Sequence, residues 1–342
     1  MSAYRRSSIM TPELMNLVAE MVEAISRYAM LAEQNLTPRL RRENRIRTIQ
    51  ASLAIENNTL TIEQVSAVIE GKRVFGHPRE IQEVRNAFAA YEAMEGWDAG
   101  SEKDLLAAHD LLMRGLVDEP GRYRSGGVGI FREKQLVHMA PPANLVSNLM
   151  ADLLAWIKNT REHPLVAICI FHYELEFIHP FADGNGRMGR LWQTLVLRNW
   201  RPLLAFVPVE TVIRKRQDAY YRALENSDRQ ADATPFVEFM LSALRDAIRE
   251  ASTDQAGDQV TDQVADQVAG LMRAIGTGEL SANDLMKALG LSHRPTFREN
   301  YLNPALVAEL IERTRPDSPR SPTQRYRLTS KGHRWRERFV KK

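Results

Sequence analysis

Apolar residues recur at three- and four-residue intervals along most of the chain, a spacing that is typical of amphipathic helices. The first helix is expected to begin at Thr11 and Pro12, which supply an N-cap and a proline at the first helical position. Few Gly or Pro residues interrupt residues 12–96, so this region is predicted to be helical. Further helices are expected over 144–158, 165–177, 187–200 and 211–249.

One stretch in the middle of the chain breaks this helical spacing. Residues 120–129 read Pro-Gly-Arg-Tyr-Arg-Ser-Gly-Gly-Val-Gly, and short apolar groups follow at 130–131 and 136–138. Gly and Pro favour turns, and short apolar runs between them favour strands, so the pattern predicts a short β-hairpin or an extended flap. The predicted fold class is therefore mainly α, with one short hairpin.

An Asp-Gln pair repeats every four residues between 254 and 268. On a helix this spacing places four acids in one drifting stripe and valines in another, so a linker helix is one interpretation. Like charges four residues apart destabilise a helix, and valine adds little helix propensity. The pattern therefore favours a partly ordered linker over residues 251–270.

Residues 271–342 predict a small second domain with three helices and a strand-like end. Gly290 is placed to end the second helix and Ser292 to cap the third. The Pro- and Ser-rich loop 315–322 would be the wing of a winged helix-turn-helix, a module that often enters the DNA major groove. A dimerisation or regulatory module of the same shape fits the pattern equally well.

Charge is distributed unevenly along the chain. Over 342 residues, 46 Lys and Arg stand against 43 Asp and Glu, a net charge of +3, yet residues 313–342 hold 11 basic and 2 acidic residues. The body of the chain is therefore slightly acidic and its tail basic. This tail points weakly to nucleic acid, and a solvated surface explains it as well.

Composition excludes several classes of protein. Cys169 is the single cysteine and lies in an apolar run, which excludes a disulfide framework and a cysteine-built zinc site. No P-loop or dinucleotide fingerprint occurs in the sequence. The first residues lack the apolar core of a secretory signal, and no apolar run approaches the ~20 residues of a membrane span. We therefore expect a cytoplasmic protein without a membrane partner.

The segment richest in chemistry is Ile178-His-Pro-Phe-Ala-Asp-Gly-Asn-Gly-Arg-Met-Gly-Arg190. An apolar helix ends before it, and its small residues open a new helix near Arg187. Gly184 and Gly186 let consecutive N–H groups point at an anion, beside the partial positive charge of a helix N-terminus. Arg187 and Arg190 lie on one helix face and present two guanidinium groups to phosphate oxygens.

Asp183 and His179 complete this set. Phosphate would repel Asp183 unless a cation lay between them, as Mg²⁺ does when one carboxylate shares it with a nucleotide. His179 is the nearby side chain suited to taking a proton near neutral pH. Each residue alone has an ordinary structural explanation, but in this order they describe a magnesium–nucleotide site with a general base.

This segment resembles the signature of the Fic (Fido) family, His-Pro-Phe-x-(Asp/Glu)-Gly-Asn-Gly-Arg-x-x-Arg, at every fixed position. The resemblance implies a mainly helical Fic core that uses Mg²⁺ and transfers AMP from ATP to Ser, Thr or Tyr hydroxyls of target proteins, or of itself. It implies that His179 is the catalytic base and Asp183 the Mg²⁺ ligand. The implied nucleotide-binding residues are Gly184, Asn185, Gly186, Arg187, Met188, Gly189 and Arg190.

Two looser elements of the family can also be placed. The family's β-hairpin flap, which aligns the target, would fall near residues 136–139 and bring Val137 and His138 to the nucleotide. Tyr220 and Tyr221 resemble a pair near the adenine in relatives, which would make Tyr221 a nucleotide-binding residue, and ordinary helix packing explains the pair equally well.

A second motif lies upstream of the signature. Ser52, Glu56 and Asn57 match the family's inhibitory motif, (Ser/Thr)-x-x-x-Glu-(Gly/Asn). Ser52 and Glu56 lie one helical turn apart, so a docked Glu56 carboxylate can pair with Arg190 and occupy the partner of the γ-phosphate. We therefore expect an autoinhibited enzyme. In some relatives the same glutamate also helps to remove AMP by orienting water.

Four segments and one main function are predicted. The segments are an N-terminal helical region with the inhibitory helix (1–95), a Fic catalytic core (96–250), a linker (251–270) and a winged-helix domain (271–342). The predicted function is that of a protein adenylyltransferase autoinhibited by Glu56, with ATP and target proteins as partners. An enzyme of the same fold that removes AMP and a nucleotide-sensing regulator that binds DNA stay open as alternatives. A homodimer is also compatible with the sequence.

Overall fold

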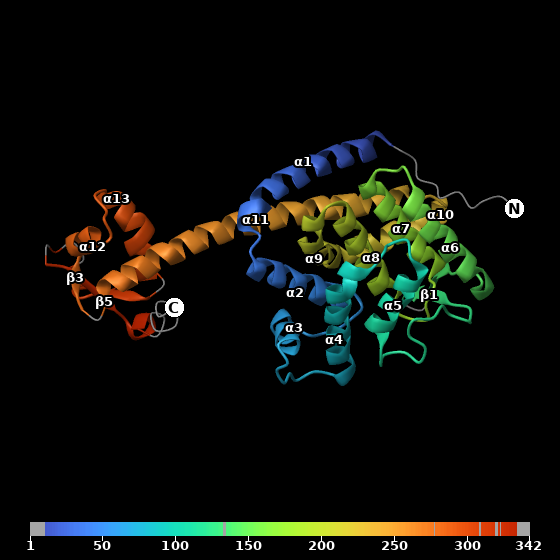
Figure 1. The fold of residues 1–342 in the computed structure, drawn as a ribbon, viewed down its shortest axis with the longest axis horizontal. Coiled ribbons are helices and arrows are strands. Elements are labelled where there is room, and N and C mark those ends of the chain that lie inside the picture. Colours follow the sequence, from blue (N-terminus) through green and yellow to red (C-terminus); the bar gives the residue numbers. More distant parts are fainter. Residues whose placement is uncertain are drawn as a thin grey trace. The chain divides into compact units, whose positions relative to one another are not determined.

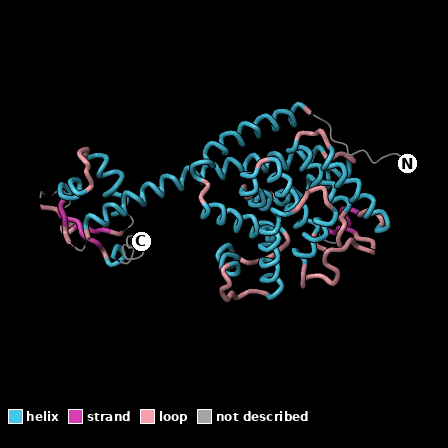
Figure 2. The backbone as a smooth tube through the Cα atoms, in the orientation of Figure 1, coloured by secondary structure: helices cyan, strands magenta, loops and turns pink. Residues whose placement is uncertain are grey.

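The structure of the chain, a computed structural model, describes residues 11–132, 135–276, 278–307, 309–318, 321 and 323–333. Within its helices and strands, the structure does not describe the side chains of residues 33–35, 130–132, 135–138 and 253–266. The chain divides into two compact units, residues 1–253 and residues 254–342. Helices dominate both units (Figures 1 and 2).

The first unit begins with four helices, α1 (Pro12–Asn35), α2 (Pro38–Ile55), α3 (Ile62–Ile69) and α4 (Pro78–Ala93), the last followed by the short 3₁₀ helix η1 (Met94–Gly96). The predicted start of α1 is confirmed, because the Thr11 side chain accepts a hydrogen bond from the Leu14 backbone N–H at 3.0 Å. Helix α2 begins in the same way, with Thr37 as its N-cap. Helices α1 and α2 therefore both start where a hydroxyl cap precedes a proline.

The middle of this unit contains α5 (Glu102–Met113), strands β1 (Gly129–Arg132) and β2 (Gln135–Met139), and α6 (Ala143–Asn159). The two strands pair antiparallel, with Gly129 opposite Met139. This pairing confirms the hairpin predicted from the Gly- and Pro-rich stretch that precedes it.

Helices α7 (Pro164–Ile178) and α8 (Asn185–Trp200) pack against each other at the centre of the unit. Most of α7 is buried, including the apolar run at residues 165–171, in which Cys169 is a buried free thiol. In α8 the fully buried Trp192 donates its indole N–H to the Ala99 carbonyl at 2.9 Å. A rigid helix pair therefore holds both ends of the short loop that contains the predicted chemistry.

The unit is completed by η2 (Pro202–Phe206), α9 (Val209–Lys215), α10 (Gln217–Gln230) and the first part of α11 (Thr234–Ile275). Helix α11 is 42 residues long and continues through residues 251–270, where the sequence favoured a partly ordered linker. Extending a helix that is already packed avoids the cost of nucleation, and this segment contains no proline. Both ends of the segment are also anchored, by the buried residues Ala251 and Val268.

The second unit combines short helices with a three-stranded antiparallel sheet. The strands lie in the order β3 (Leu280–Ser281), β5 (Arg325–Leu328), β4 (Ile311–Arg313). The helices are α12 (Ala282–Ala288), α13 (Arg294–Phe297), η3 (Arg298–Leu302) and α14 (Asn303–Val307). Leu271, Leu285 and Phe297 are fully buried in its core. The loop predicted to be a wing joins β4 to β5.

Two capping predictions for this unit have opposite outcomes. Gly290 follows the end of α12 with a φ of +67°, which confirms it as the residue that ends this helix. The prediction that Ser292 caps the next helix is wrong, because His293 is the N-cap of α13 and its Nδ1 accepts the Thr296 N–H at 3.4 Å. Pro295, in the first turn, starts the helix one residue later than the serine indicated.

The N-terminal helical region (1–95) and the catalytic core (96–250), which the sequence divides, lie in one compact unit. Its hydrophobic core extends from Leu14 in α1 to Ala251 in α11. Within the described part of the chain, no helix is long and apolar enough to cross a membrane.

Candidate functional site

Helix α2 ends in a tight turn at Glu56. Glu56 is the C-cap residue, and Asn57 after it has a left-handed backbone with a φ of +69°. The backbone N–H groups of Asn57 and Asn58 donate to the carbonyls of Ala54 and Leu53, both at 3.1 Å. Glycine and asparagine tolerate this conformation best, which explains why the motif has one of them at this position.

Arg190, at 1% exposure, is more deeply buried than Arg187, the other arginine of the site. Its Nε donates to Ser52 Oγ at 2.9 Å, and its Nη2 donates to the Ser52 carbonyl at 3.0 Å and to Glu56 Oε1 at 2.7 Å. Burial alone lowers the pKa of Arg190, but attraction to the Glu56 carboxylate helps to outweigh it, and the net pKa is raised. The structure thus brings both polar residues of α2 to one guanidinium.

The Glu56 carboxylate also lies against the loop between α7 and α8. A Cβ added to Gly186 would collide with Glu56 Oε1 and would come within 3.0 Å of Arg190 Nη1. Glycine is therefore the residue that fits between this carboxylate and the loop backbone. The side chain of Glu56 is 32% exposed, so solvent reaches the outer side of the ion pair.

The backbone of this loop is tightly constrained. His179, the C-cap of α7, has a left-handed backbone with a φ of +48°, and Gly184, the N-cap of α8, has a φ of +84°. A Cβ on Gly184 would come within 2.6 Å of Met113 Sδ. The Asn185 side chain accepts the Phe181 N–H and donates to the Phe181 carbonyl, both at 2.9 Å. These contacts hold the loop at the start of α8, where the first backbone N–H groups lack partners within the helix.

His109 supports the same loop from α5, a role that no motif in the sequence indicates. Its ring stacks on Phe181, with 3.8 Å between centroids and 5° between planes. Its Nδ1 accepts the Gly121 N–H at 2.9 Å, and its Nε2 lies 3.1 Å from the Asp183 carbonyl oxygen. This arrangement requires a neutral imidazole that donates from Nε2. Burial lowers the pKa of His109 to about 4, which keeps it neutral.

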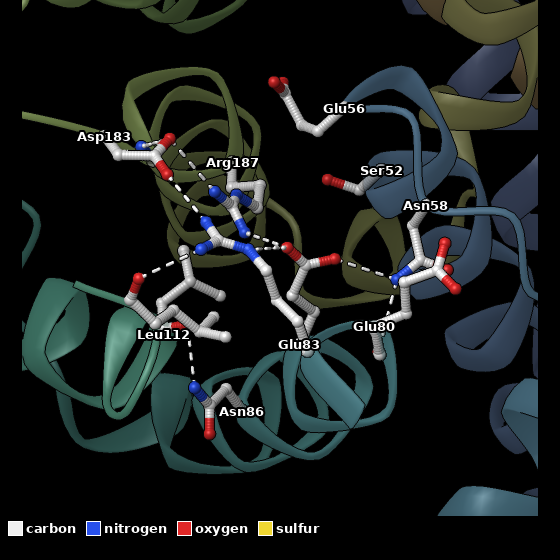
Figure 3. Close-up of polar contacts among 12 residues, drawn as sticks. Ser52, Glu56, Asn58, Glu80, Glu83, Asn86, Leu112, Asp183 and Arg187 are labelled. Carbon is white, nitrogen blue, oxygen red and sulfur yellow. Dashed lines mark hydrogen bonds and ion pairs between the residues drawn. The ribbon is translucent and has the colours of Figure 1, made fainter. Parts of the chain in front are cut away.

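Arg187 lies between two carboxylates (Figure 3). Its guanidinium contacts Asp183 Oδ1 at 3.2 Å and Glu83 Oε1 at 3.3 Å. Glu83, on α4, also accepts a hydrogen bond from Asn58 Nδ2 at 2.9 Å, two residues beyond Glu56. The end of α2 is therefore joined to the loop a second time, through Asn58, Glu83 and Arg187, a connection that no motif indicates.

Asp183 is the carboxylate that could hold a cation. Its side chain is 45% exposed and pairs with Arg187 and, at 3.3 Å, with Arg79 Nη2. Among the described residues, no three His, Cys, Asp or Glu side chains form a group that could hold a metal ion. Mg²⁺ prefers oxygen ligands and commonly takes some of them from phosphate. One partly exposed carboxylate beside the loop that is predicted to bind an anion fits such an ion, once Arg79 moves away.

Several other predicted site residues lie away from the Glu56–Arg190 ion pair, and two have side chains that the structure does not describe. Met188 is fully buried in the hydrophobic core. A Cβ on Gly189 would come within 2.8 Å of the His172 ring, so this glycine allows α7 and α8 to approach closely. The side chains of Val137 and His138 lie outside the residues that the structure describes.

Tyr220 and Tyr221 are neighbours on α10 with different surroundings. Tyr220 is 2% exposed, and its hydroxyl lies 3.2 Å from His172 Nε2, so it belongs to the core. Tyr221 is half-buried. Gln217 Nε2 donates to the Ile55 carbonyl at 3.0 Å and to the Tyr221 hydroxyl at 3.5 Å, which places Tyr221 near the end of α2.

Two family profiles match the sequence. Residues 99–197 match the Fic/DOC family, and residues 266–329 match the filamentation induced by cAMP protein Fic-like, C-terminal domain. The first match includes the whole loop between α7 and α8. The second lies within the second compact unit.

Solved structures share this fold. The crystal structure of a Fic family protein from Desulfovibrio desulfuricans G20 is 78% identical, with a TM-score of 0.76 over 96% of this chain and 99% of that one. A Fic domain containing signaling protein from Bacteroides thetaiotaomicron is 20% identical, with a TM-score of 0.58 over 70% of this chain and 98% of that one. At that identity the second structure shows a common fold alone.

Curated relatives are more distant. The protein adenylyltransferases Fic of Aedes aegypti and Drosophila melanogaster are each 29% identical over a match of 215 residues that covers 59% of this chain. These residues make up 40% and 41% of the relatives, so the chain spans about two fifths of their length.

His109→Gln tests whether His109 supports the loop from α5. The quantity compared is the pH dependence of the free energy of unfolding. The pKa of His109 is about 4 in the folded chain and ~6.5 in an unfolded one, so between these values the unfolded state binds more protons. The free energy of unfolding should therefore fall as the pH drops, by about 2 kcal/mol between pH 7 and pH 5. Glutamine keeps a donor and an acceptor but does not titrate, so the variant should lose this part of the acid destabilisation.

Urea unfolding of the wild type and His109→Gln at both pH values measures the difference. His77→Gln is the control, because His77 is an exposed histidine at the start of α4. It should keep the pH dependence of the wild type. The same acid destabilisation in His109→Gln as in the wild type would show that His109 is not a buried neutral support.

Proposed function

The chain belongs to the Fic family, and from this we propose that it transfers AMP from ATP to Ser, Thr or Tyr hydroxyls of proteins and that Glu56 inhibits the transfer. Relatives named protein adenylyltransferase support this class of reaction. The composition of the loop supports it as well, since it combines one histidine, one carboxylate, an anion-binding backbone and two arginines.

The contact between Glu56 and Arg190 is the observation that carries the proposal. A γ-phosphate bound by Arg190 would need the guanidinium that Glu56 holds at 2.7 Å. A hydrogen bond to a charged group is worth about 1.5–3 kcal/mol, and each ~1.4 kcal/mol is a factor of ten in an equilibrium constant. The ion pair would therefore disfavour productive ATP binding by roughly 10- to 100-fold.

In the proposed reaction, the target hydroxyl oxygen attacks the α-phosphorus and the bond to the pyrophosphate oxygen breaks in line with it. His179 takes the hydroxyl proton as general base. Backbone N–H groups at the start of α8 stabilise charge on the transferring phosphate, while Arg187 and Arg190 hold the leaving pyrophosphate. Asp183 would hold Mg²⁺, which neutralises phosphate charge when it is bound.

Removal of AMP is the alternative reaction for the same residues. Glu56 Oε1 lies against Gly186, and about a third of the Glu56 side chain is exposed. A carboxylate in this position can orient a water molecule toward a phosphate held by the loop. This feature favours removal when a modified target rather than ATP is offered.

DNA binding is a second candidate, supported by the basic surface of the second unit. Arg294 in α13 and Arg298 in η3 are exposed, as are Arg325 and Arg327 in β5. Basic side chains on the second helix of a helix-turn-helix and on its wing commonly contact DNA. Residues 334–342, which hold part of the basic tail, lie outside the described residues.

Glu56→Gly should raise AMP transfer by about 10- to 100-fold, because Arg190 then becomes available to the γ-phosphate. The measurement follows label from the α-phosphate of ATP onto protein bands in a cell lysate with Mg²⁺. His179→Ala added to this variant should abolish the label, because no base then takes the hydroxyl proton.

Glu70→Gly is the matched control. Glu70 is the C-cap of α3, as Glu56 is of α2, and it pairs with Lys72 at 2.6 Å on the surface. Its label should equal that of the wild type. Wild-type label in Glu56→Gly would refute inhibition by Glu56, whereas loss of AMP from a pre-modified target without any transfer would identify the removal reaction.

Arg298→Ala in the full chain tests whether the second unit binds DNA. If Arg298 contacts a phosphate, the slope of log affinity for duplex DNA against log salt should become shallower by about 0.9. Arg122→Ala, an exposed change in the first unit, should leave this slope unchanged. The absence of salt-dependent duplex binding by the wild type would remove the candidate.

A further inference from the structure

Arg124 lies between α5 and β1 and is 6% exposed. Its side chain donates hydrogen bonds to four backbone carbonyls, those of His179 at 2.7 Å, Gly126 at 2.8 Å, Pro141 at 2.6 Å and Ile178 at 3.2 Å. Its own backbone N–H donates to the Pro180 carbonyl at 2.9 Å. Five hydrogen bonds from one residue therefore end on backbone oxygens.

These carbonyls belong to segments that are far apart in the sequence. Residues 178–180 form the junction between α7 and the loop of the site, whereas Pro141 follows strand β2 of the hairpin. One buried guanidinium thus joins the end of the hairpin to the backbone of the proposed general base, His179.

Arg124 contacts His179, whose backbone has an unfavourable conformation. A residue other than glycine seldom adopts a φ of +48°, and it stays there where its surroundings fix it. Arg124 fixes the carbonyls of His179 and of both its neighbours. The guanidinium binds the carbonyls of Ile178 and His179 together because its five N–H donors form a rigid fork, which the single ammonium of lysine cannot reproduce.

The hydrogen bonds that the Arg124 side chain donates to described residues all end on neutral carbonyls. Within the described part of the chain, none of its partners is a carboxylate, although buried cations are usually paired with one. The cost of burying this charge is therefore offset by backbone carbonyls. The stability of the buried Arg124 charge therefore depends on the positions of the carbonyls that it contacts.

We infer that Arg124 is a positioning residue for AMP transfer, which fixes the backbone of His179 and its spacing from the hairpin. The inference rests on the proposed function, in which His179 takes a proton from a target hydroxyl. A base must lie within hydrogen-bond reach of that proton, and a displacement of ~1 Å can lower a rate about 100-fold. ATP is held by other groups, the N–H groups of the loop and two arginines of α8, so its affinity does not depend on Arg124.

The test adds Arg124→Lys or Arg124→Gln to the full chain that carries Glu56→Gly. Arg124→Lys keeps the charge and removes the fork, so it serves if Arg124→Gln does not fold. We expect kcat for transfer to fall about 10- to 100-fold with KM for ATP changed less than about twofold. The matched control is Arg122→Lys, two residues away, whose side chain is 74% exposed and pairs with Glu119 at 3.4 Å.

The control should keep the kcat of its parent. A parental kcat in Arg124→Lys would overturn the inference, and so would a loss of activity that appears as weaker ATP binding.

Hydrogen exchange separates this inference from the proposed function, because it needs no transfer. Backbone amides of residues 179–186 should exchange faster in Arg124→Lys than in the parent, while those of the buried helix α7 keep their rates. If the parent transfers no AMP, the proposed function fails and exchange still decides the role of Arg124. Unchanged exchange at 179–186, or faster exchange throughout the unit, would overturn that role.

Discussion

The site depends on one buried cation that needs an anion. Arg190 is 1% exposed, and a buried charge without a partner is strongly unfavourable. In this chain Glu56 supplies the anion at 2.7 Å. In the proposed reaction a phosphate supplies it. Because Glu56 and a phosphate would compete for this guanidinium, the interaction that joins the end of α2 to the loop is also the one that would inhibit the transfer.

The surrounding fold holds the loop and the end of α2 close together. The packed pair of α7 and α8 holds the loop, and His109 and Arg124 support it through backbone contacts. The end of α2 is also joined to the loop through Glu83, whose carboxylate contacts Arg187. Release of Glu56 would therefore leave a second connection in place, so the helix would stay close to the site after Arg190 had changed its partner.

Consecutive residues could be recognised in the sequence, whereas long-range contacts could not. Residues 179–190 and 52–57 each form a local pattern whose spacing reflects one loop or one helical turn. His109 and Arg124 contact backbone oxygens 74 and 55 residues away, and a backbone partner leaves no side-chain pattern to find. The segment 251–270 was predicted to be partly ordered and is helical for another reason. Local repulsion between its acids is weaker than the tendency of a helix anchored at both ends to continue.

The most direct test of this account measures the dissociation constants of ATP and ADP for the wild type and Glu56→Gly by calorimetry. If Arg190 exchanges Glu56 for the γ-phosphate, the wild type should bind the two nucleotides about equally, because that contact is blocked. Glu56→Gly should then prefer ATP over ADP by roughly 10- to 100-fold, the worth of one charged hydrogen bond. The same ratio of ATP to ADP affinity in both proteins would contradict the account.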